Sequence, residues 1–126
     1  MKSNESSENY LETILILSGK KPVVRSVDIA EELGFKKSSV SVAMKNLRQR
    51  KLITVRPEGY IYLTEEGQKI ADMIYERHQL LSGWLMSIGV DPETAVEDAC
   101  RIEHVISPES FDAIKRALNL GEYANG

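Results

Sequence analysis

Apolar residues near the amino terminus repeat every three or four positions, which is the spacing of one helix face. Leu11, Ile14 and Leu15 carry this pattern in a segment from Ser7 to Leu17, and Gly19 follows it. Because glycine commonly ends a helix, the pattern predicts a first helix over residues 7–17.

The next two segments predict a pair of helices separated by a tight turn. Ser26 has a side chain typical of a helix N-cap, and the helix after it continues to Leu33, where Gly34 stops it. Ser38 or Ser39 caps a further helix, which carries apolar residues at helical spacing. A short helix, a glycine-containing turn and a second helix together form a helix-turn-helix.

Two β-rich runs follow directly, at residues 52–55 and 60–64, with Pro57 and Gly59 between them. Proline and glycine between two such runs indicate a hairpin. A hairpin placed directly after the second helix is the wing of a winged helix-turn-helix. We therefore assign residues 1–65 to a DNA-binding domain of this kind.

The second half of the chain predicts helices only. Residues 66–88 carry an apolar stripe at helical spacing, which is longer than a short wing can cover. Pro92 after Asp91 and Pro108 after Ser107 each start a further helix, because proline is favoured at the first helical position. The fold class is therefore mainly α with a small β-hairpin, and residues 66–126 form a helical region that we expect to dimerise.

Composition excludes several classes of protein. The chain has 126 residues, of which 42% are hydrophobic and 28% charged, as in ordinary globular proteins. No window approaches 18 apolar residues, so we expect neither a membrane span nor a secretory signal. The one cysteine, Cys100, cannot form an internal disulfide, which favours a reducing cytoplasm.

The charge is unevenly distributed along the chain. The net charge is −3, but residues 20–56 hold ten basic and three acidic residues, so this block carries +7 and the remainder −10. A basic block inside an acidic protein is expected where a surface meets the phosphates of double-stranded DNA. A solvated basic face or a protein-interaction module would show the same charge pattern.

The second helix of the helix-turn-helix supplies most candidates for DNA contact, because an α-helix fits the major groove and its first residues reach base edges. Serine hydroxyls suit phosphate oxygens or any base edge, and Val42 can touch a thymine methyl. Basic side chains at the end of this helix and in the wing suit the phosphate backbone. The predicted DNA-contacting residues are Arg25, Lys37, Ser38, Ser39, Ser41, Val42, Lys45, Arg48, Arg50 and Arg56.

A possible metal site lies in the helix after Pro92. Cys100, Glu103 and His104 are spaced i, i+3 and i+4, so they share one helix face and offer a thiolate, a carboxylate and an imidazole. These are common donors to first-row transition metals. The triplet alone is also compatible with a half-buried cysteine beside surface residues.

Several stretches together resemble the diphtheria toxin repressor and manganese transport regulator family of metal-dependent repressors. They are residues 8–12, 27–33, 38–41, 63–67, 77–78 and 99–107, the last reading ACRIEHVIS, and the resemblance runs from about residue 7 to residue 118. It implies a homodimer whose metal-bound form binds operator DNA and represses metal-uptake genes. Because the chain ends at Gly126, the resemblance implies the short form without an SH3-like domain.

The resemblance also implies a ligand set that extends beyond one helix. The implied metal ligands are Asn9, Glu12, His78, Cys100, Glu103 and His104. Ser82 and Val96 stand where iron-type members have Glu and His, so we do not expect a complete iron-type second site. An ion joining the first helix to the dimerising half would set the spacing of the two recognition helices, which must be about one DNA turn, roughly 34–36 Å.

Ligand chemistry bears on which ion is bound. The Cys100 thiolate favours Fe(II) over Mn(II), whereas Glu12 and the Asn9 amide suit harder ions. We expect a divalent transition metal, with Fe(II) favoured and Mn(II) second.

Two other classes of function remain as alternatives. In the first, the chain is a winged-helix redox sensor with Cys100 as its thiol switch. In the second, it is a metal-dependent hydrolase, which is disfavoured because no nucleophile–base pair stands out. We therefore predict that the chain is not an enzyme and binds neither a small organic substrate nor a membrane.

Overall fold

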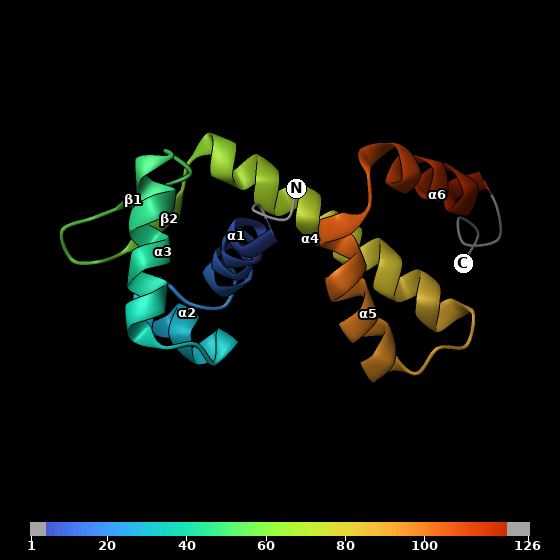
Figure 1. The fold of residues 1–126 in the computed structure, drawn as a ribbon, viewed down its shortest axis with the longest axis horizontal. Helices are drawn as coiled ribbons and strands as arrows, with labels where there is room; N and C mark the ends of the chain where they lie inside the picture. The colour runs from blue at the N-terminus through green and yellow to red at the C-terminus, as the bar shows by residue number, and fades with distance from the viewer. Residues whose placement is uncertain (1–4, 121–126) are drawn as a thin grey trace. The chain divides into compact units, whose positions relative to one another are not determined.

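The computed structural model describes residues 5–120. The chain divides after Met73 into two compact units. The N-terminal unit contains α1 (Glu5–Ser18), α2 (Ser26–Leu33), α3 (Lys37–Gln49), β1 (Ile53–Val55), β2 (Ile61–Leu63) and the first part of α4 (Glu65–Ser87) (Figure 1). The expected helix-turn-helix followed by a wing is confirmed.

The core of the N-terminal unit is formed by the apolar residues that recur at helical spacing. Leu11 and Ile14 of α1, Ile29 of α2 and Leu47 of α3 are all at most 1% exposed. In the hairpin, β1 and β2 are antiparallel, with Ile53 opposite Leu63. Because the apolar face of α3 is buried in this core, the other face of α3 points toward solvent.

The start of α2 differs from the prediction. Ser26 is the first helical residue, and Arg25 occupies the N-cap position. The carboxylate of Asp28 accepts a hydrogen bond from the backbone N–H of Arg25 at 2.8 Å. This hydrogen bond holds the pKa of Asp28 below its usual value, and the Lys21 ammonium, 3.3 Å from Oδ1 of Asp28, acts in the same direction. Asp28 therefore satisfies the N–H of the N-cap residue, and Ser26 does not cap the helix as expected.

The start of α3 also differs from the prediction. The helix begins at Lys37, and Lys36 stands at the N-cap without a side-chain hydrogen bond. Ser38 and Ser39 consequently lie in the first turn, where both are exposed. Gly34, between α2 and α3, has a φ of 71°, a left-handed conformation that suits glycine and ends α2 as expected.

The wing and α4 meet at a close backbone contact. A Cβ added at Gly67, in the first turn of α4, would lie 2.0 Å from the carbonyl oxygen of Leu52. The backbone N–H of Gly67 donates to the hydroxyl of Thr64 at 3.1 Å, and that hydroxyl donates to the carbonyl of Lys51 at 2.8 Å. The short segment before β1 is thereby fixed to the beginning of α4.

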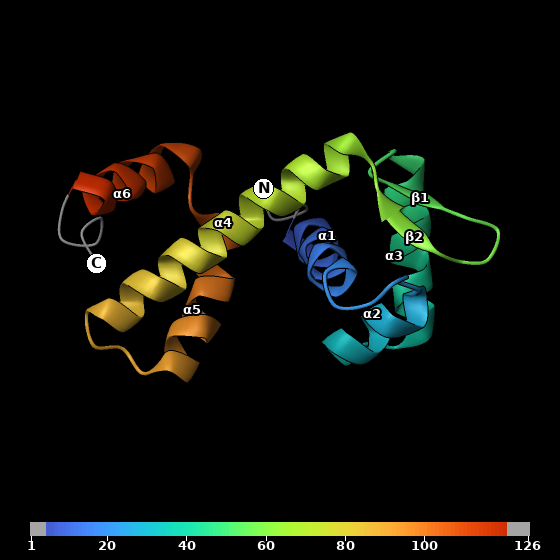
Figure 2. The same cartoon turned by 180° about the vertical axis from the view of Figure 1, so that it is seen from behind.

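The C-terminal unit contains the rest of α4, α5 (Pro92–Val105) and α6 (Pro108–Leu120) (Figure 2). Its core includes Leu81, Ala99 and Phe111, one from each helix. Both helix starts marked by proline are confirmed. The Asp91 carboxylate accepts a hydrogen bond from the backbone N–H of Glu93 at 3.1 Å. The Ser107 hydroxyl likewise accepts one from the backbone N–H of Ser110. None of the described helices is long and apolar enough to cross a membrane.

Candidate metal centre and nucleic-acid interface

Side chains of the kinds that can bind a metal gather where α4 and α5 lie alongside one another in the C-terminal unit. His78 projects from α4, and Cys100 and Glu103 project from α5. One donor atom from each of the three lies within 4.8 Å of the donors of the other two. Three donors at this spacing can converge on one divalent cation.

Glu103 lies at the centre of this cluster and is fully buried. Its Oε1 is 2.9 Å from Nδ1 of His78, and its Oε2 is 3.3 Å from Nε2 of His104. Within residues 5–120, Oε2 has no hydrogen-bond partner. A buried carboxylate oxygen without a hydrogen bond is costly, and a cation would remove that cost. The donor set therefore fits a divalent transition metal.

Two of the predicted ligands differ in exposure. The side chain of His104 is only 4% exposed, whereas Cys100 is exposed. The Glu103 carboxylate and the neighbouring His104 imidazole are thus buried, whereas the residue that carries the thiol of the cluster is exposed. An ion could therefore reach these donors from solvent on the side of Cys100.

The structure places the other two predicted ligands on α1, in the N-terminal unit. Asn9 and Glu12 lie three residues apart and therefore share a helix face. The backbone carbonyl of Asn9 accepts a hydrogen bond from the Thr13 hydroxyl at 2.8 Å, as is common for threonine within a helix. Four of the six predicted ligands thus belong to one unit, and the participation of Asn9 and Glu12 stays a prediction.

The outer face of α3 carries the predicted DNA-contacting residues. Ser38, Ser41 and Lys45 are all exposed, and Val42 is 70% exposed. Val40 and Leu47 on the opposite face are buried. A helix with a hydroxyl-rich and basic outer face, presented by a fixed apolar face, can enter a DNA major groove.

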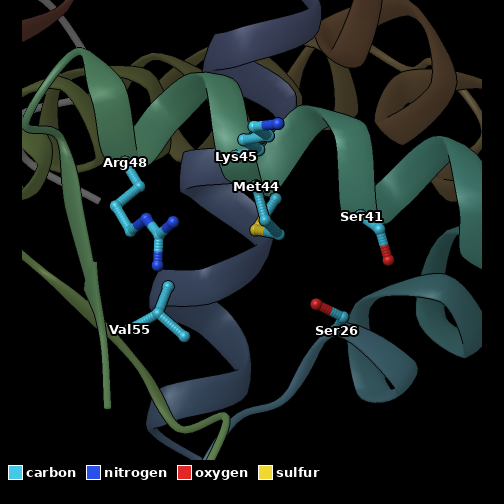
Figure 3. A pocket seen from close by; sticks show the side chains of 6 residues that line it. All are labelled: Ser26, Ser41, Met44, Lys45, Arg48 and Val55. Carbon is cyan, nitrogen blue, oxygen red and sulfur yellow. The ribbon is translucent and has the colours of Figure 1, made fainter. Parts of the chain in front are cut away.

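A hollow of about 220 Å³ lies beside this face (Figure 3). The hydroxyls of Ser26 and Ser41 stand on one side of it, and Arg48 stands beside Val55 on the other. Its complete lining is Ser26, Ser41, Met44, Lys45, Arg48 and Val55. Two hydroxyls and two cationic side chains suit a phosphate group. The sequence pattern around Ser26 indicates only a helix start, because the position of Ser26 beside α3 depends on tertiary packing.

Two of the predicted DNA-contacting arginines are held by neighbours in the same unit. The Arg25 guanidinium lies 5.0 Å from the centre of the Tyr60 ring. Arg50 donates to the hydroxyl of Ser7 at 2.7 Å, so its guanidinium is tied to α1. Arg56 lies in the wing loop, where its backbone N–H donates to the carbonyl of Tyr60.

Comparison with known proteins determines the family. Residues 3–61 match the family described as "Iron dependent repressor, N-terminal DNA binding domain", and residues 64–123 match "Iron dependent repressor, metal binding and dimerisation domain". The chain is 37% identical over 111 residues to the transcriptional regulator MntR of Escherichia coli O6:H1, covering 88% of this chain and 72% of that protein. This chain belongs to the iron-dependent repressor family of metal-dependent transcriptional regulators.

Other relatives agree with this assignment. The chain is 37% identical to the HTH-type transcriptional regulator MntR of Bacillus pumilus, covering 86% of this chain and 76% of that regulator. The solved structure of the manganese regulator SloR superposes with a TM-score of 0.80 at 27% identity, over 91% of this chain and 54% of the SloR chain. This repressor therefore spans about half the length of SloR.

The family assignment settles the class of function. Members are transcriptional regulators that depend on a metal, bind DNA and form dimers, and they are not enzymes. The predicted repressor class is confirmed. The alternative of a redox sensor with Cys100 as a thiol switch is not supported by these relationships.

Proposed function

We propose that this repressor binds its corepressor ion through His78, Cys100, Glu103 and His104, and that the ion is Fe(II) or Mn(II). The observation that carries the proposal is the buried Glu103 carboxylate, with an imidazole on either side and one oxygen lacking a hydrogen bond. When bound, the ion supplies positive charge that neutralises this carboxylate. The thiol and both imidazoles must be deprotonated to act as ligands, so acid weakens binding.

Cys100 bears on the choice of ion. A thiolate ligand favours Fe(II), whereas Mn(II) prefers oxygen donors. In favour of Mn(II), the structural relative SloR is a manganese regulator. We propose that both ions serve and that Cys100 shifts the preference toward Fe(II).

Control of DNA binding requires that the ion affect the N-terminal unit. We propose that Asn9 and Glu12 of α1 complete the ligand set, as the resemblance over residues 8–12 implies. Ligands from both units would make the arrangement that binds DNA more stable when the ion is present. Such coupling is typically worth about 1–3 kcal/mol.

We propose that the outer face of α3 reads the operator and that the hollow beside it receives a backbone phosphate. The support is the gathering of Ser26, Ser41, Lys45 and Arg48 around one depression. Two copies in a dimer would present two such faces to a double-stranded operator with two-fold symmetry. We propose that this repressor acts in the cytoplasm, where it would meet its operator DNA.

The test begins with operator sequences selected from a random duplex library in the presence of Mn(II). Affinity for a selected duplex is then measured by fluorescence anisotropy with Mn(II), with anaerobic Fe(II) and with chelator. We expect affinity to rise with either ion, and the rise to disappear in Glu103→Gln. Asp98→Asn is the matched control, because Asp98 is a carboxylate of α5 that pairs with the exposed Arg101. Equal affinity with and without ions in the unaltered chain would contradict the proposal.

A further inference from the structure

Arg77, the residue before His78 on α4, is a buried cation that does not belong to the ligand set. It is 7% exposed. Its Nη1 donates to the backbone carbonyl oxygens of Glu103 and Ile106, each at 3.0 Å. Its guanidinium also lies over the ring of Phe111 in α6, 5.4 Å from the ring centre. Arg77 therefore contacts both other helices of the C-terminal unit.

The two carbonyls that Arg77 contacts lie at the carboxyl end of α5. The last four carbonyls of a helix lack partners within the helix, and the helix dipole places partial negative charge there. A buried guanidinium satisfies two of these acceptors and is itself stabilised by that charge. The end of α5 that bears Glu103 and His104 is thus fixed to α4.

We propose that Arg77 is a positioning residue of the metal centre. Arg77 holds the backbone of Glu103, while the adjacent His78 contacts the carboxylate of the same residue at 2.9 Å. Two consecutive residues of α4 thereby fix Glu103 at both its backbone and its side chain. Arg77 acts on the ion only through Glu103, because a cationic side chain is not a ligand. This inference rests on the metal site proposed above.

The expected effect separates positioning from a general role in folding. Groups that orient metal ligands typically change affinity by about 10–100-fold. We expect Arg77→Met to weaken binding of Co(II), a spectroscopic substitute for Fe(II), within that range. Arg77→Lys keeps a buried cation that can donate to carbonyls, so it should restore most of the affinity. Arg101→Met, at an exposed position of α5, serves as the matched control and should bind like the unaltered chain.

The test titrates the full-length apoprotein with Co(II) and records both the affinity and the visible and thiolate charge-transfer bands. Circular dichroism establishes that each variant is folded. Arg77→Met should alter the Co(II) bands as well as the affinity. In a double variant with Glu103→Gln, loss of Arg77 should cause little further weakening, because its effect passes through Glu103.

Specific results would overturn the inference. One is an Arg77→Met variant with unchanged Co(II) affinity and bands, and another is a full additional loss in the Glu103→Gln background. If Arg77→Met does not fold, Arg77→Gln replaces it. The Co(II) affinity of Arg77→Gln should fall by about tenfold, the low end of the range for groups that orient metal ligands. Unchanged affinity in that variant would likewise overturn the inference. Absence of Co(II) binding by the unaltered chain would instead contradict the metal site itself.

Discussion

Oε1 of Glu103 and Nδ1 of His78 lie 2.9 Å apart, although 25 positions separate the two residues in the chain. The contact joins α5 to α4 and brings together donors from two helices. Glu103 is fully buried, so its charge must be compensated within the protein or by an ion. This relationship gives the strongest local evidence for a metal centre.

Replacing Glu103 by Gln should abolish most metal binding without unfolding the protein. The amide preserves the shape of the side chain but removes the buried charge and the anionic ligand. Loss of a group that only orients a metal ligand lowers metal affinity by up to about 100-fold. We expect the loss of the Glu103 ligand itself to lower the affinity at least as far. The apoprotein should be as stable as the unaltered chain or more so, because a buried charge has been removed. Isothermal titration with Mn(II) and urea unfolding of the apoprotein measure the two effects, and a strongly destabilised apoprotein would contradict the expectation.

Replacing Cys100 by Glu should change which ion is preferred. An added carboxylate favours Mn(II), and loss of the thiolate removes the feature that favours Fe(II). We expect the ratio of Mn(II) to Fe(II) affinity to rise by about tenfold, the size of effect seen for changes near a metal. Anaerobic competition between the two ions measures the ratio. Cys100→Ala is the control, since it removes the thiolate without adding an oxygen donor, and an unchanged ratio in the Glu variant would refute a selective role.

Lys45 and Val42 should affect DNA binding in different ways. Lys45→Ala removes a cation at the hollow, so affinity should fall similarly for all sequences, and the slope of log affinity against log salt should decrease by about 1. Val42→Ser leaves the charge unchanged, so the salt slope should stay the same. The preference of the protein for thymine at one operator position should instead weaken, by about 1 kcal/mol, the scale of burying one methyl group. Anisotropy across a salt series and selection from random duplexes measure these effects, and identical behaviour of the two variants would contradict the assignment.

Asp28 should make the stability of the N-terminal unit depend on pH. The backbone N–H of Arg25 lowers the pKa of Asp28 in the folded protein. The ionised form therefore stabilises folding above the usual carboxylate range, and this contribution is lost as pH falls through the folded pKa. Asp28→Ala should cost about 1 kcal/mol at neutral pH, as loss of a helix-start contact typically does, and less in acid. Urea unfolding at neutral and acidic pH tests this, and a difference that grows in acid would contradict it.

Local signals in the sequence located most helix boundaries. Asp91 and Ser107 each precede a proline, and both side chains accept the expected backbone hydrogen bonds. The start of α2 lies one residue before the predicted one and the start of α3 two or three residues before, because Ser26, Ser38 and Ser39 are all plausible caps in isolation. At α2, the choice was decided by Asp28 reaching the N–H of Arg25.

The candidate metal site could be predicted only in part from spacing. Cys100, Glu103 and His104 share a face of one helix, which spacing alone shows. The approach of His78 depends on how α4 packs against α5, and it was suggested only by the family resemblance. Arg77 stands in one of the stretches that carry the family resemblance, but nothing in the sequence indicates its role, which consists of contacts with backbone carbonyls 26 and 29 positions away.

The contact between Gly67 and the carbonyl of Leu52 reverses an ordinary rule of helix composition. Inside an exposed helix, alanine is favoured over glycine by about 1 kcal/mol. At position 67 a single methyl group would collide with a backbone oxygen, since its carbon would lie 2.0 Å away. Without a shift of the backbone, only glycine fits at this position. A library randomised at this codon and selected for repression should return glycine almost exclusively.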